Sequence, residues 1–575
     1  MKPIALLLLF LLFGLNSSAQ NFHLQLIGSS ESENKALDSL IYNSKHTNIK
    51  SIIDEINLTS ERLSKKGYIE NRMLENTKQN DSSYIAKFNL GERINSIHIY
   101  IGRKILSQTL SFGEGEETLK NILESKKDTL TLPYGEIEPF LNQSLQKLEQ
   151  KGFALAKLKL INIQKKNNSL YAELQFESNQ QRKLNSIVVR FAENNKKNSF
   201  AEGHLNQINR KYRNNTFNQD IVRKVHNDFE KFSFVSQVKY PEILFTKDST
   251  KVYVYLEKRK SNNFDGFIGF TNNNNNKLVF NGYLDLTLEN ALKAGEQFSI
   301  NWKSDGNYQK TFKASIDLPY LFKSPIGLKA QIYIFKQDSI FQNTKTAFDL
   351  GYLVDYSTRI YLGYQSTESS DIQNTNNSSI SDYNNSFLTS NLEYTKLDPI
   401  NSTFPKKTTL SITLGTGKRT TNGLTETLGT NKQTYINVFA MHNFYLNKKN
   451  CININYHNYF LKSDTYIINE LYRFGGIKSI RGFAENSLQA SFMTALITEY
   501  RYIISRELFI HSILDYGYYQ DGSSKNNDNL LGLGLGMGLQ TKNGLLKISF
   551  ANGSTNTQKI KFGNTIVNLC YNAVF

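Results

Sequence analysis

The sequence lacks long apolar segments beyond its first residues. After residue 20, no stretch of the 575 residues is long and apolar enough to form a transmembrane helix. The mean hydropathy of -0.45 alone would suggest a soluble protein. That inference fails for membrane β-barrels, because their strands alternate apolar and polar residues and so have a low average hydropathy. The absence therefore excludes a helical membrane protein but not a barrel.

Cysteine is also scarce, which excludes a scaffold built on disulfides. The chain has two, Cys451 and Cys570, and both lie in segments with strand-like alternation that would place them on the inside of a barrel. We expect them to be free and structural. The histidines have no metal-ligand spacing, and no nucleophile, base and acid stand in a catalytic pattern. We therefore expect no catalytic residue, no metal, no cofactor and no enzymatic activity.

The N-terminal residues have the pattern of an export signal. A basic start is followed by an apolar run at residues 4–15, with small residues at Ser17 and Ala19. This predicts a signal peptide over residues 1–19. The alternative is an uncleaved anchor, although the run is too short to span a bilayer as a helix. No cysteine stands directly after the predicted cleavage site, which argues against a lipid-anchored N-terminus.

The charge is strongly positive. Lys and Arg number 68 against 51 Asp and Glu, a formal net charge of +17. A basic protein can bind nucleic acid, but the predicted export and the scattering of the basic residues among Asn and Ser argue against that partner. We interpret the charge as a cationic barrel lumen or as attraction to anionic outer-membrane lipid, added to a general bias toward Lys and Asn.

A weak internal repeat occupies the first half of the chain. The sequence KGYI at residues 66–69 recurs as KGFA at 151–154, and RINSIHI at 93–99 recurs as KLNSIVV at 183–189. The repeat length of roughly 85 to 90 residues is typical of a small domain repeated in tandem. Together with the alternating helical and strand patterns, it predicts three α+β units of the order βααββ, at residues 20–91, 92–179 and 180–260.

Each unit has recognisable elements. Helices are expected where apolar residues recur at helical spacing and strands where they alternate. Gly67 and Gly152 are expected to end the helices before them. The predicted strands are 22–27, 84–90, 97–101, 156–163, 169–177, 187–191, 234–241 and 251–257, and the predicted helices are 49–63, 137–151 and 221–232.

From residue 261 to residue 575 nearly every segment resembles a strand. In the segment that starts at Cys451, apolar side chains at 452, 454, 456 and 460 alternate with polar ones at 453, 455 and 457. Tight turns alternate with long polar connections such as 366–384 and 418–433. A soluble β-sandwich would also alternate, but short turns on one side and long loops on the other favour an antiparallel transmembrane barrel. We count about sixteen strands of membrane-spanning length.

The first and last of these strands would close the barrel. The first, at about residues 264–270, is short and carries Gly266 and Gly269, so we expect weak pairing at this seam. The last, at about 567–575, ends on Phe575 with apolar residues on one face. A terminal strand with an aromatic last residue resembles the targeting signal of outer-membrane barrels. The alternative is an ordinary edge strand.

One long connection, residues 464–490, carries the most informative motif. It contains Gly475 and Gly476, followed by Arg481, Gly482 and Phe483. This string resembles the signature of the superfamily that includes BamA, TamA and the two-partner-secretion transporters, in which a loop folds into the barrel and an Arg-Gly-aromatic tip meets the inner wall. The three tandem α+β units resemble the POTRA domains of the same superfamily. Any run of small α+β domains is the alternative for these units.

The physics of a buried arginine supports the resemblance. An unpaired charge inside a barrel is costly, so Arg481 needs a carboxylate partner. Strand alternation places Glu499 and Asp515 on the inward faces of two following strands, and the resemblance implies that acidic residues on these strands meet the loop arginine. A guanidinium can bridge both in a geometry that lysine cannot reproduce. A solvated loop with an incidental arginine is the competing interpretation.

The resemblance implies an outer-membrane protein with its N-terminal units in the periplasm. Its layout is closest to TamA and implies insertion or movement of client proteins at the outer membrane, by handover from the POTRA-like units to the barrel seam. The expected partners are unfolded or partly folded outer-membrane proteins and lipid, with periplasmic or inner-membrane accessory proteins as further candidates. The main alternative is a two-partner-secretion transporter that exports one cognate protein. A barrel enzyme or passive porin has less support.

Overall fold

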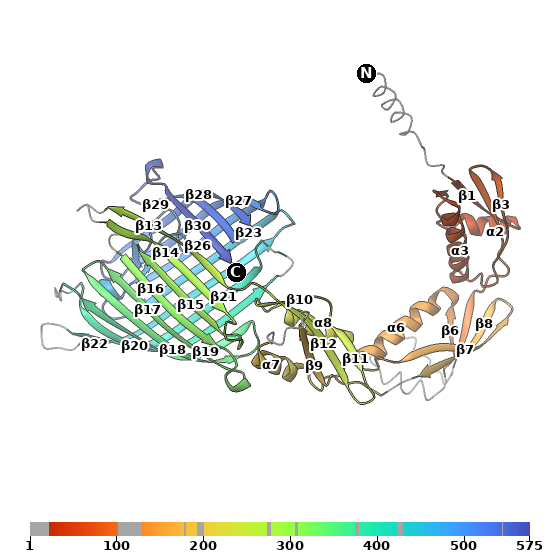
Figure 1. Cartoon of the computed structure of the whole chain (residues 1–575), viewed down its shortest axis with the longest axis horizontal. Coiled ribbons are helices and arrows are strands. Elements are labelled where there is room, and N and C mark those ends of the chain that lie inside the picture. The colour runs from red at the N-terminus through yellow and green to blue at the C-terminus, as the bar shows by residue number, and fades with distance from the viewer. Residues whose placement is uncertain are drawn as a thin grey trace, which may run out of the picture. The chain divides into compact units, whose positions relative to one another are not determined.

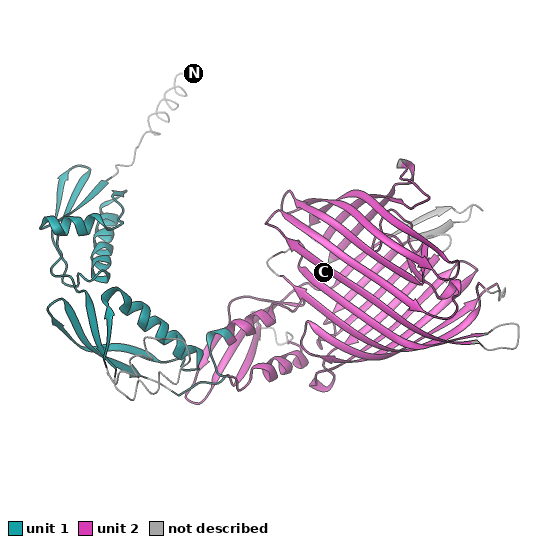
Figure 2. Ribbon diagram, turned by 180° about the vertical axis from the view of Figure 1, so that it is seen from behind, with its two compact units in different colours: residues 1–183, 216–220 teal, residues 184–215, 221–575 magenta. Residues whose placement is uncertain are grey.

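The computed structural model describes residues 22–101, 129–177, 180–191, 200–272, 278–304, 309–373, 379–398, 401, 403–422, 429–542 and 544–575. The predicted signal peptide lies outside these residues. The chain forms two compact units, one of residues 1–183 with 216–220, the other of residues 184–215 with 221–575 (Figure 2). Among the described residues, no helix combines the length and hydrophobicity needed to cross a membrane.

The first unit begins with a four-stranded sheet of order β2-β1-β4-β3. Its long helix is capped by Asn48, whose side chain accepts a hydrogen bond from the Ser51 N–H at 2.8 Å. The helix ends before Gly67, which has a φ of 99°. That helix buries Ile52 and Leu63 in the domain core. The elements are β1 (Phe22–Gly28), α2 (Glu31–Asp38), β2 (Lys45–His46), α3 (Ile49–Lys65), β3 (Arg72–Asn80) and β4 (Ser83–Asn89).

A second sheet, of order β6-β5-β8-β7, repeats this design in the same unit. Its strands β5 and β8 are parallel neighbours, as are β1 and β4 in the first sheet. Gly152 follows its helix at a φ of 93°, the position that Gly67 takes in the first sheet. The elements are β5 (Ser96–Tyr100), β6 (Thr129–Pro133), α6 (Ile137–Gln150), β7 (Lys157–Lys166) and β8 (Ser169–Glu177).

The second unit begins with a third small sheet, in which β12 pairs with β9, β10 and β11. The predicted single strand at residues 234–241 is wrong, because β10 ends at Gln237 and β11 begins only after Pro241, which has no N–H to give to a ladder. The elements are β9 (Ser186–Phe191), α7 (Glu202–Tyr212), α8 (Gln219–Phe229), β10 (Val235–Gln237), β11 (Glu242–Phe245) and β12 (Thr250–Lys258).

A closed antiparallel barrel of sixteen strands follows (Figure 1), which confirms the predicted fold class. The strands extend into stretches predicted as long loops, since β19 continues to Asp371 and β20 starts at Asp382. They are β13 (Asn263–Asn272), β14 (Leu278–Glu289), β15 (Gln297–Ser304), β16 (Gln309–Leu318), β17 (Ile326–Gln337), β18 (Phe341–Leu353), β19 (Thr358–Asp371), β20 (Asp382–Leu397), β21 (Lys406–Asn422), β22 (Gly429–Tyr445), β23 (Asn450–Lys462), β26 (Phe492–Ile503), β27 (Leu508–Asp521), β28 (Asn526–Thr541), β29 (Gly544–Ser554) and β30 (Ile566–Val574).

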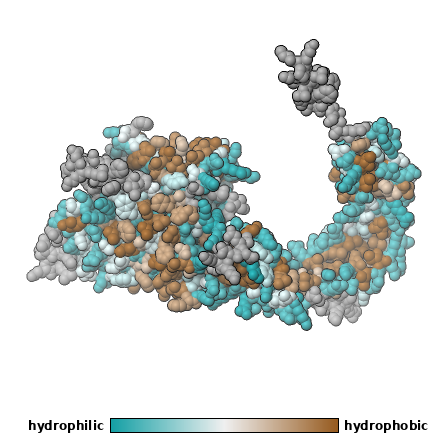
Figure 3. All heavy atoms as spheres, viewed as in Figure 1, coloured by the Kyte–Doolittle hydropathy of each residue, from teal (hydrophilic) through white to brown (hydrophobic). Residues whose placement is uncertain are grey.

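The two faces of the barrel wall differ as a membrane requires. On β27, Leu514 and Tyr516 are exposed on the outer face, while Asp515 between them is buried inside. The same alternation holds on β18, where Asp349 is buried and Leu350 is exposed. Hydrophobic residues gather over the outer surface of the strands in Figure 3. Apolar side chains therefore face lipid and polar side chains face the lumen.

The seam between the first and last strands is short. β13 pairs with β14 over ten residue pairs but with β30 over three, from Asn263↔Val574 to Asp265↔Asn572. The Phe575 N–H adds one bond to the Asn262 carbonyl at 3.0 Å. Gly266 and Gly269 lie in β13 just beyond the paired stretch. Residues 566–571 of β30 have ladder partners on β29 alone among the described residues.

Candidate functional site

The segment between β23 and β26 folds into the barrel instead of continuing its sheet. It holds a short helix, η3 (Ile468–Glu470), and a hairpin of β24 (Tyr472–Phe474) and β25 (Leu488–Ala490), which pair with each other and form a separate sheet. Between the two hairpin strands lies the tip. Its Ile480 is fully buried and belongs to a core with Met493 and Leu530 of the barrel wall. We refer to residues 464–490 as the inward loop.

Three glycines allow the tip to turn and approach the wall. Gly475, Gly476 and Gly482 have φ values of 106°, 98° and 88°, a region that side chains with a Cβ rarely adopt. A Cβ on Gly482 would overlap the backbone of Asn552 and Gly553 on β29. The loop backbone therefore lies directly against the wall at this point, and a larger residue would have to displace one of them.

Arg481 is the centre of the contact between tip and wall. Its side chain is 3% exposed, and Asp515, on β27, is 0% exposed. The guanidinium donates to Asp515 through Nε at 2.8 Å and Nη2 at 2.6 Å, while the Arg481 backbone N–H donates to the same carboxylate at 3.0 Å. Nη1 pairs with Glu499 on β26. One side chain thus bridges two neighbouring strands with charge-assisted hydrogen bonds.

Glu499 has additional cationic partners. Lys547 of β29 donates to it at 2.8 Å, and Arg501 pairs with its other oxygen at 2.7 Å. The buried cluster therefore holds three cations and two carboxylates. Glu499 would keep two positive neighbours without the loop, whereas Asp515 depends on Arg481 for its charge compensation. The two carboxylates have unequal roles, although the sequence pattern treats them alike.

The anchor also fills a gap in the barrel sheet. The β26–β27 ladder is interrupted after Thr498↔Leu514 and resumes at Arg501↔His511. At the gap, the Thr498 carbonyl accepts a hydrogen bond from Arg481 Nη2 at 3.1 Å, and the Thr498 N–H donates to Asp515 at 3.3 Å. Backbone groups left unpaired in a buried wall are costly, so the loop arginine and its partner replace part of the missing ladder.

The start of the inward loop has a second anchor on a distant part of the wall. Arg419 of β21 pairs with Glu470 of η3, and their side chains are 2% and 1% exposed. Gln433 of β22 donates to the same carboxylate at 2.8 Å, and Arg419 donates to Thr465 at 2.8 Å. Next to them, the Asn343 side chain donates to the Asn469 carbonyl at 2.6 Å.

More exposed ion pairs connect the tip to strands close to the seam. Lys478 pairs with Asp285 of β14 at 2.7 Å, and Glu485 pairs with Lys303 of β15 at 2.7 Å. Gly482 meanwhile lies against β29, on the other side of the seam in the order of strands. Within a few residues, the tip therefore contacts both sides of the closing junction.

The structure brings together most of the residues that the sequence pattern selected. Arg481, Glu499 and Asp515 form one cluster, and Gly482 packs on the wall beside it. Phe483 is partly buried against the core of Phe474 and Ile480. Gly266, Gly269 and Phe575 lie at the seam instead, a separate place on the barrel.

Sequence reasoning missed four charged residues of the site. Arg419 and Glu470 lie 51 positions apart, and Arg501 and Lys547 carry no motif. Alternation could have placed Arg419 on the inward face of its strand, but nothing local shows which residue of the loop it meets.

Across the part of the chain that the structure describes, no group of three His, Cys, Asp or Glu side chains could hold a metal. The cluster can hold and position a loop.

Part of the chain matches one known family, and several solved structures are similar to it. Residues 290–564 match the model of the Omp85 superfamily domain. A search of curated proteins finds no match. Among solved structures, BamA from Haemophilus ducreyi lacking POTRA domains 1–3 is 16% identical and covers 76% of this chain and 93% of its own, with a TM-score of 0.46. CdiB from Acinetobacter baumannii is 13% identical, covers 84% and 90%, and has a TM-score of 0.49. CdiB from Escherichia coli is 10% identical, covers 90% and 98%, and has a TM-score of 0.48.

Proposed function

We propose that this outer-membrane barrel with POTRA-like units, which matches the Omp85 superfamily domain over residues 290–564, is an assembly factor. In this proposal it inserts client proteins through the β13–β30 seam. Omp85 proteins are transporters or assembly factors. The observation that carries the finer assignment is the seam itself, which has three residue pairs where the adjacent β13–β14 junction has ten.

The seam gives the proposed mechanism its physical basis. A strand edge without a ladder partner presents backbone N–H and C=O groups that can pair with another chain. Residues 566–571 of β30 have such an edge on the β13 side among the described residues. A client strand that pairs there gains main-chain hydrogen bonds while it enters the membrane. No covalent chemistry is needed, so the proposed activity requires no catalytic residue.

The periplasmic part supports assembly over secretion. A two-partner-secretion transporter is expected to have two POTRA-like units and a plug helix, whereas three units resemble the TamA layout. Here the first unit is a folded sheet-and-helix domain whose core includes Leu24, Ile52, Leu63 and Phe88. Its strand β3 lies at the sheet edge and is exposed along its whole length. Such an edge could bind an extended client segment by strand addition.

A disulfide across the seam tests the proposal. Phe264 and Ala573 lie directly opposite each other, so Phe264→Cys with Ala573→Cys should cross-link β13 to β30, in a background of Cys451→Ser and Cys570→Ser. We expect the oxidised protein, reconstituted in liposomes, to lose at least 90% of its insertion of an unfolded eight-stranded outer-membrane barrel protein, and the reduced protein to regain it.

A second disulfide away from the seam provides the control. Leu362 and Ser390 lie opposite each other on β19 and β20, and the Leu362→Cys with Ser390→Cys lock should leave insertion unchanged. Insertion by the oxidised seam variant at the rate of the control would contradict the proposal. If the seam variant fails to insert clients but a secreted protein still crosses the membrane through it, the chain combines both activities. If even the reduced protein inserts no client, and the oxidised protein secretes as well as the reduced one, the chain is a secretion transporter.

A further inference from the structure

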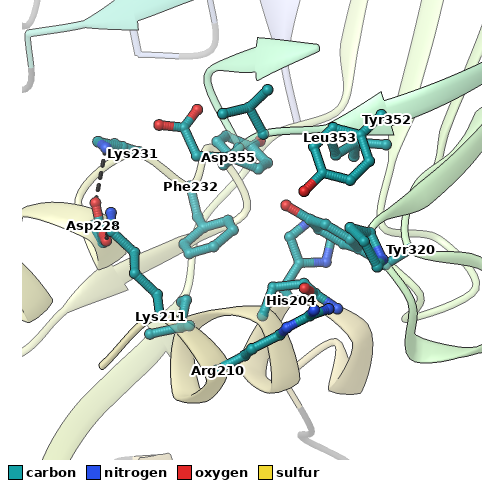
Figure 4. Close-up of a pocket in the computed structure, with 15 residues that line it drawn as sticks. His204, Arg210, Lys211, Asp228, Lys231, Phe232, Tyr320, Tyr352, Leu353 and Asp355 are labelled. Carbon is teal, nitrogen blue, oxygen red and sulfur yellow. Dashed lines mark hydrogen bonds and ion pairs between the residues drawn. The ribbon is translucent and has the colours of Figure 1, made fainter. Parts of the chain in front are cut away.

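A cavity lies where the third POTRA-like unit meets the barrel. Residues 184–215 and 221–575, which include both of these parts, form one compact unit. The volume of the cavity is about 320 Å³. Helix α7 forms one side, and the turns that join β16 to β17 and β18 to β19 form the other (Figure 4). These turns belong to the end of the barrel that faces the third POTRA-like unit, which is the periplasmic end. None of the residues that line the cavity takes part in the inward-loop site.

The cavity contains a buried histidine without hydrogen-bond partners. His204 is 1% exposed, and within the described part of the chain neither of its ring nitrogens has a partner. Burial, with a smaller contribution from Arg359, lowers the pKa of His204 to about 3. The ring is therefore neutral, and its polar edge lies against Gly295 in the turn between β14 and β15. Tyr320 packs edge-on against it at a centroid distance of 4.6 Å. Both nitrogens are closed off from solvent, so the ring forms part of the cavity wall and the other lining residues decide what the cavity binds.

The charges around the cavity favour an anion. Arg210, Lys211 and Lys231 line it together with two carboxylates, Asp228 and Asp355. Asp228 already pairs with Lys211 at 2.8 Å and with Lys231 at 2.7 Å. Arg210 is exposed and forms no ion pair with any described residue. One cation is thus in excess, and an arginine is well suited to bind a phosphate group by two parallel hydrogen bonds.

The outer rim of the cavity is the lipid-facing wall of the barrel. Tyr352 and Val354 line the cavity and are also 53% and 57% exposed. Leu350, two residues earlier on the outer face of β18, is exposed as well. An occupant with a phosphate in the cavity and apolar chains along β18 would match both chemistries. Tyrosines are enriched at the membrane–water interface of membrane proteins, because their rings suit the level of the lipid headgroups.

We propose that this cavity binds the headgroup of a phospholipid from the periplasmic leaflet. Arg210 pairs with the phosphate, and the ring of His204 lies beside it as part of the cavity wall. The acyl chains lie on the outer wall along Leu350 and Tyr352. A lipid held in this way joins the third POTRA-like unit to the membrane beside the barrel. The proposal stands independently of the seam mechanism, because it uses none of the seam or loop residues.

Binding of a soluble short-chain lipid tests the site. The full chain is purified in a neutral detergent, delipidated and titrated with dihexanoylphosphatidylglycerol, with glycerol 3-phosphate and with dihexanoylglycerol. We expect the phospholipid to bind best. Arg210→Glu should weaken its binding at least tenfold, while Arg213→Glu, a change of the nearby exposed arginine that does not line the cavity, should leave it unchanged.

Three outcomes would overturn the proposal. In the first, the Arg210→Glu variant binds the phospholipid as tightly as the unchanged protein does. In the second, glycerol 3-phosphate binds as tightly as the phospholipid. In the third, dihexanoylglycerol binds as tightly as the phospholipid. The first removes the site, the second makes it a free phosphate site, and the third makes it an apolar groove. The variant His204→Phe keeps an aromatic ring but removes both nitrogens, which are closed off from solvent, and it should leave binding unchanged. Heat-modifiable migration on gels verifies that each variant contains a folded barrel.

Discussion

The wall at strands β26 and β27 and the seam between β13 and β30 belong to one closed sheet, but their strands are held together differently. At the wall, a side chain from inside the lumen bonds two neighbouring strands through buried charges. At the seam, three residue pairs join the strands. Buried, fully paired charges resist separation because removing one partner leaves the other uncompensated, whereas a few edge hydrogen bonds can exchange with those of another strand. In the proposed function, the seam is therefore the part that opens while the wall keeps its frame.

The strongest test of this comparison removes the guanidinium. Arg481→Ala leaves Asp515 buried without its cationic partner, while Glu499 keeps Arg501 and Lys547. We expect a loss of about 3 to 5 kcal/mol in the free energy of unfolding, which is the usual effect of breaking a buried pair. Urea unfolding in detergent micelles measures it. Arg506→Ala, at an exposed turn, is the control. Normal stability and normal client insertion by Arg481→Ala would remove the anchor from the proposed mechanism.

A smaller effect is expected from the glycine beside it. In Gly482→Ala the new Cβ meets the backbone of Asn552 and Gly553, at a φ of 88° that favours glycine. Overpacking and backbone strain should together cost about 1 to 3 kcal/mol, measured by the same unfolding experiment. Gly563→Ala is the matched control, because its Cβ would have open space. Equal effects of the two substitutions would show that the tip does not depend on close contact with the wall.

The smallest effect is expected near the seam. Lys478 is 68% exposed where it pairs with Asp285, and an exposed pair usually contributes about 0.2 to 1 kcal/mol. Lys478→Ala and Asp285→Asn, alone and combined, should give a coupling energy below about 1 kcal/mol in a double-mutant cycle. A coupling as large as that of Arg481 with Asp515 would place a strong clamp beside the seam and would remove the contrast between the two regions.

Much of the architecture could be predicted from the sequence, because it depends on local periods. Alternation predicted about sixteen strands, and it placed Glu499 and Asp515 on the inward face, where they meet Arg481 as the sequence predicted. Helix α3 and its end at Gly67 followed from apolar spacing and from the glycine. The break before Pro241 and the extension of β19 to Asp371 were missed, since polar strand ends and short edge strands have weak patterns.

The remaining features depend on which strands become neighbours in space. Arg419 and Glu470 meet because η3 reaches across the lumen to β21, and no spacing in the sequence encodes that distance. The cavity around His204 depends in the same way on contact between α7 and two barrel turns. His204 itself has no neighbouring motif and resembles an ordinary helix residue in the sequence.

The interrupted β26–β27 ladder has a consequence for the geometry of the whole barrel. The diameter and strand tilt of a closed sheet are set by the stagger between its strands, and stagger can change wherever two strands slide past each other. At Glu499 and Tyr500, the backbone bonds that would normally prevent sliding are missing. Arg481 replaces part of them from inside, so the loop holds the stagger of β26 and β27 at this gap. A barrel that opens at its seam would then keep the stagger of β26 and β27, which are separated from β30 by β28 and β29 in the order of strands.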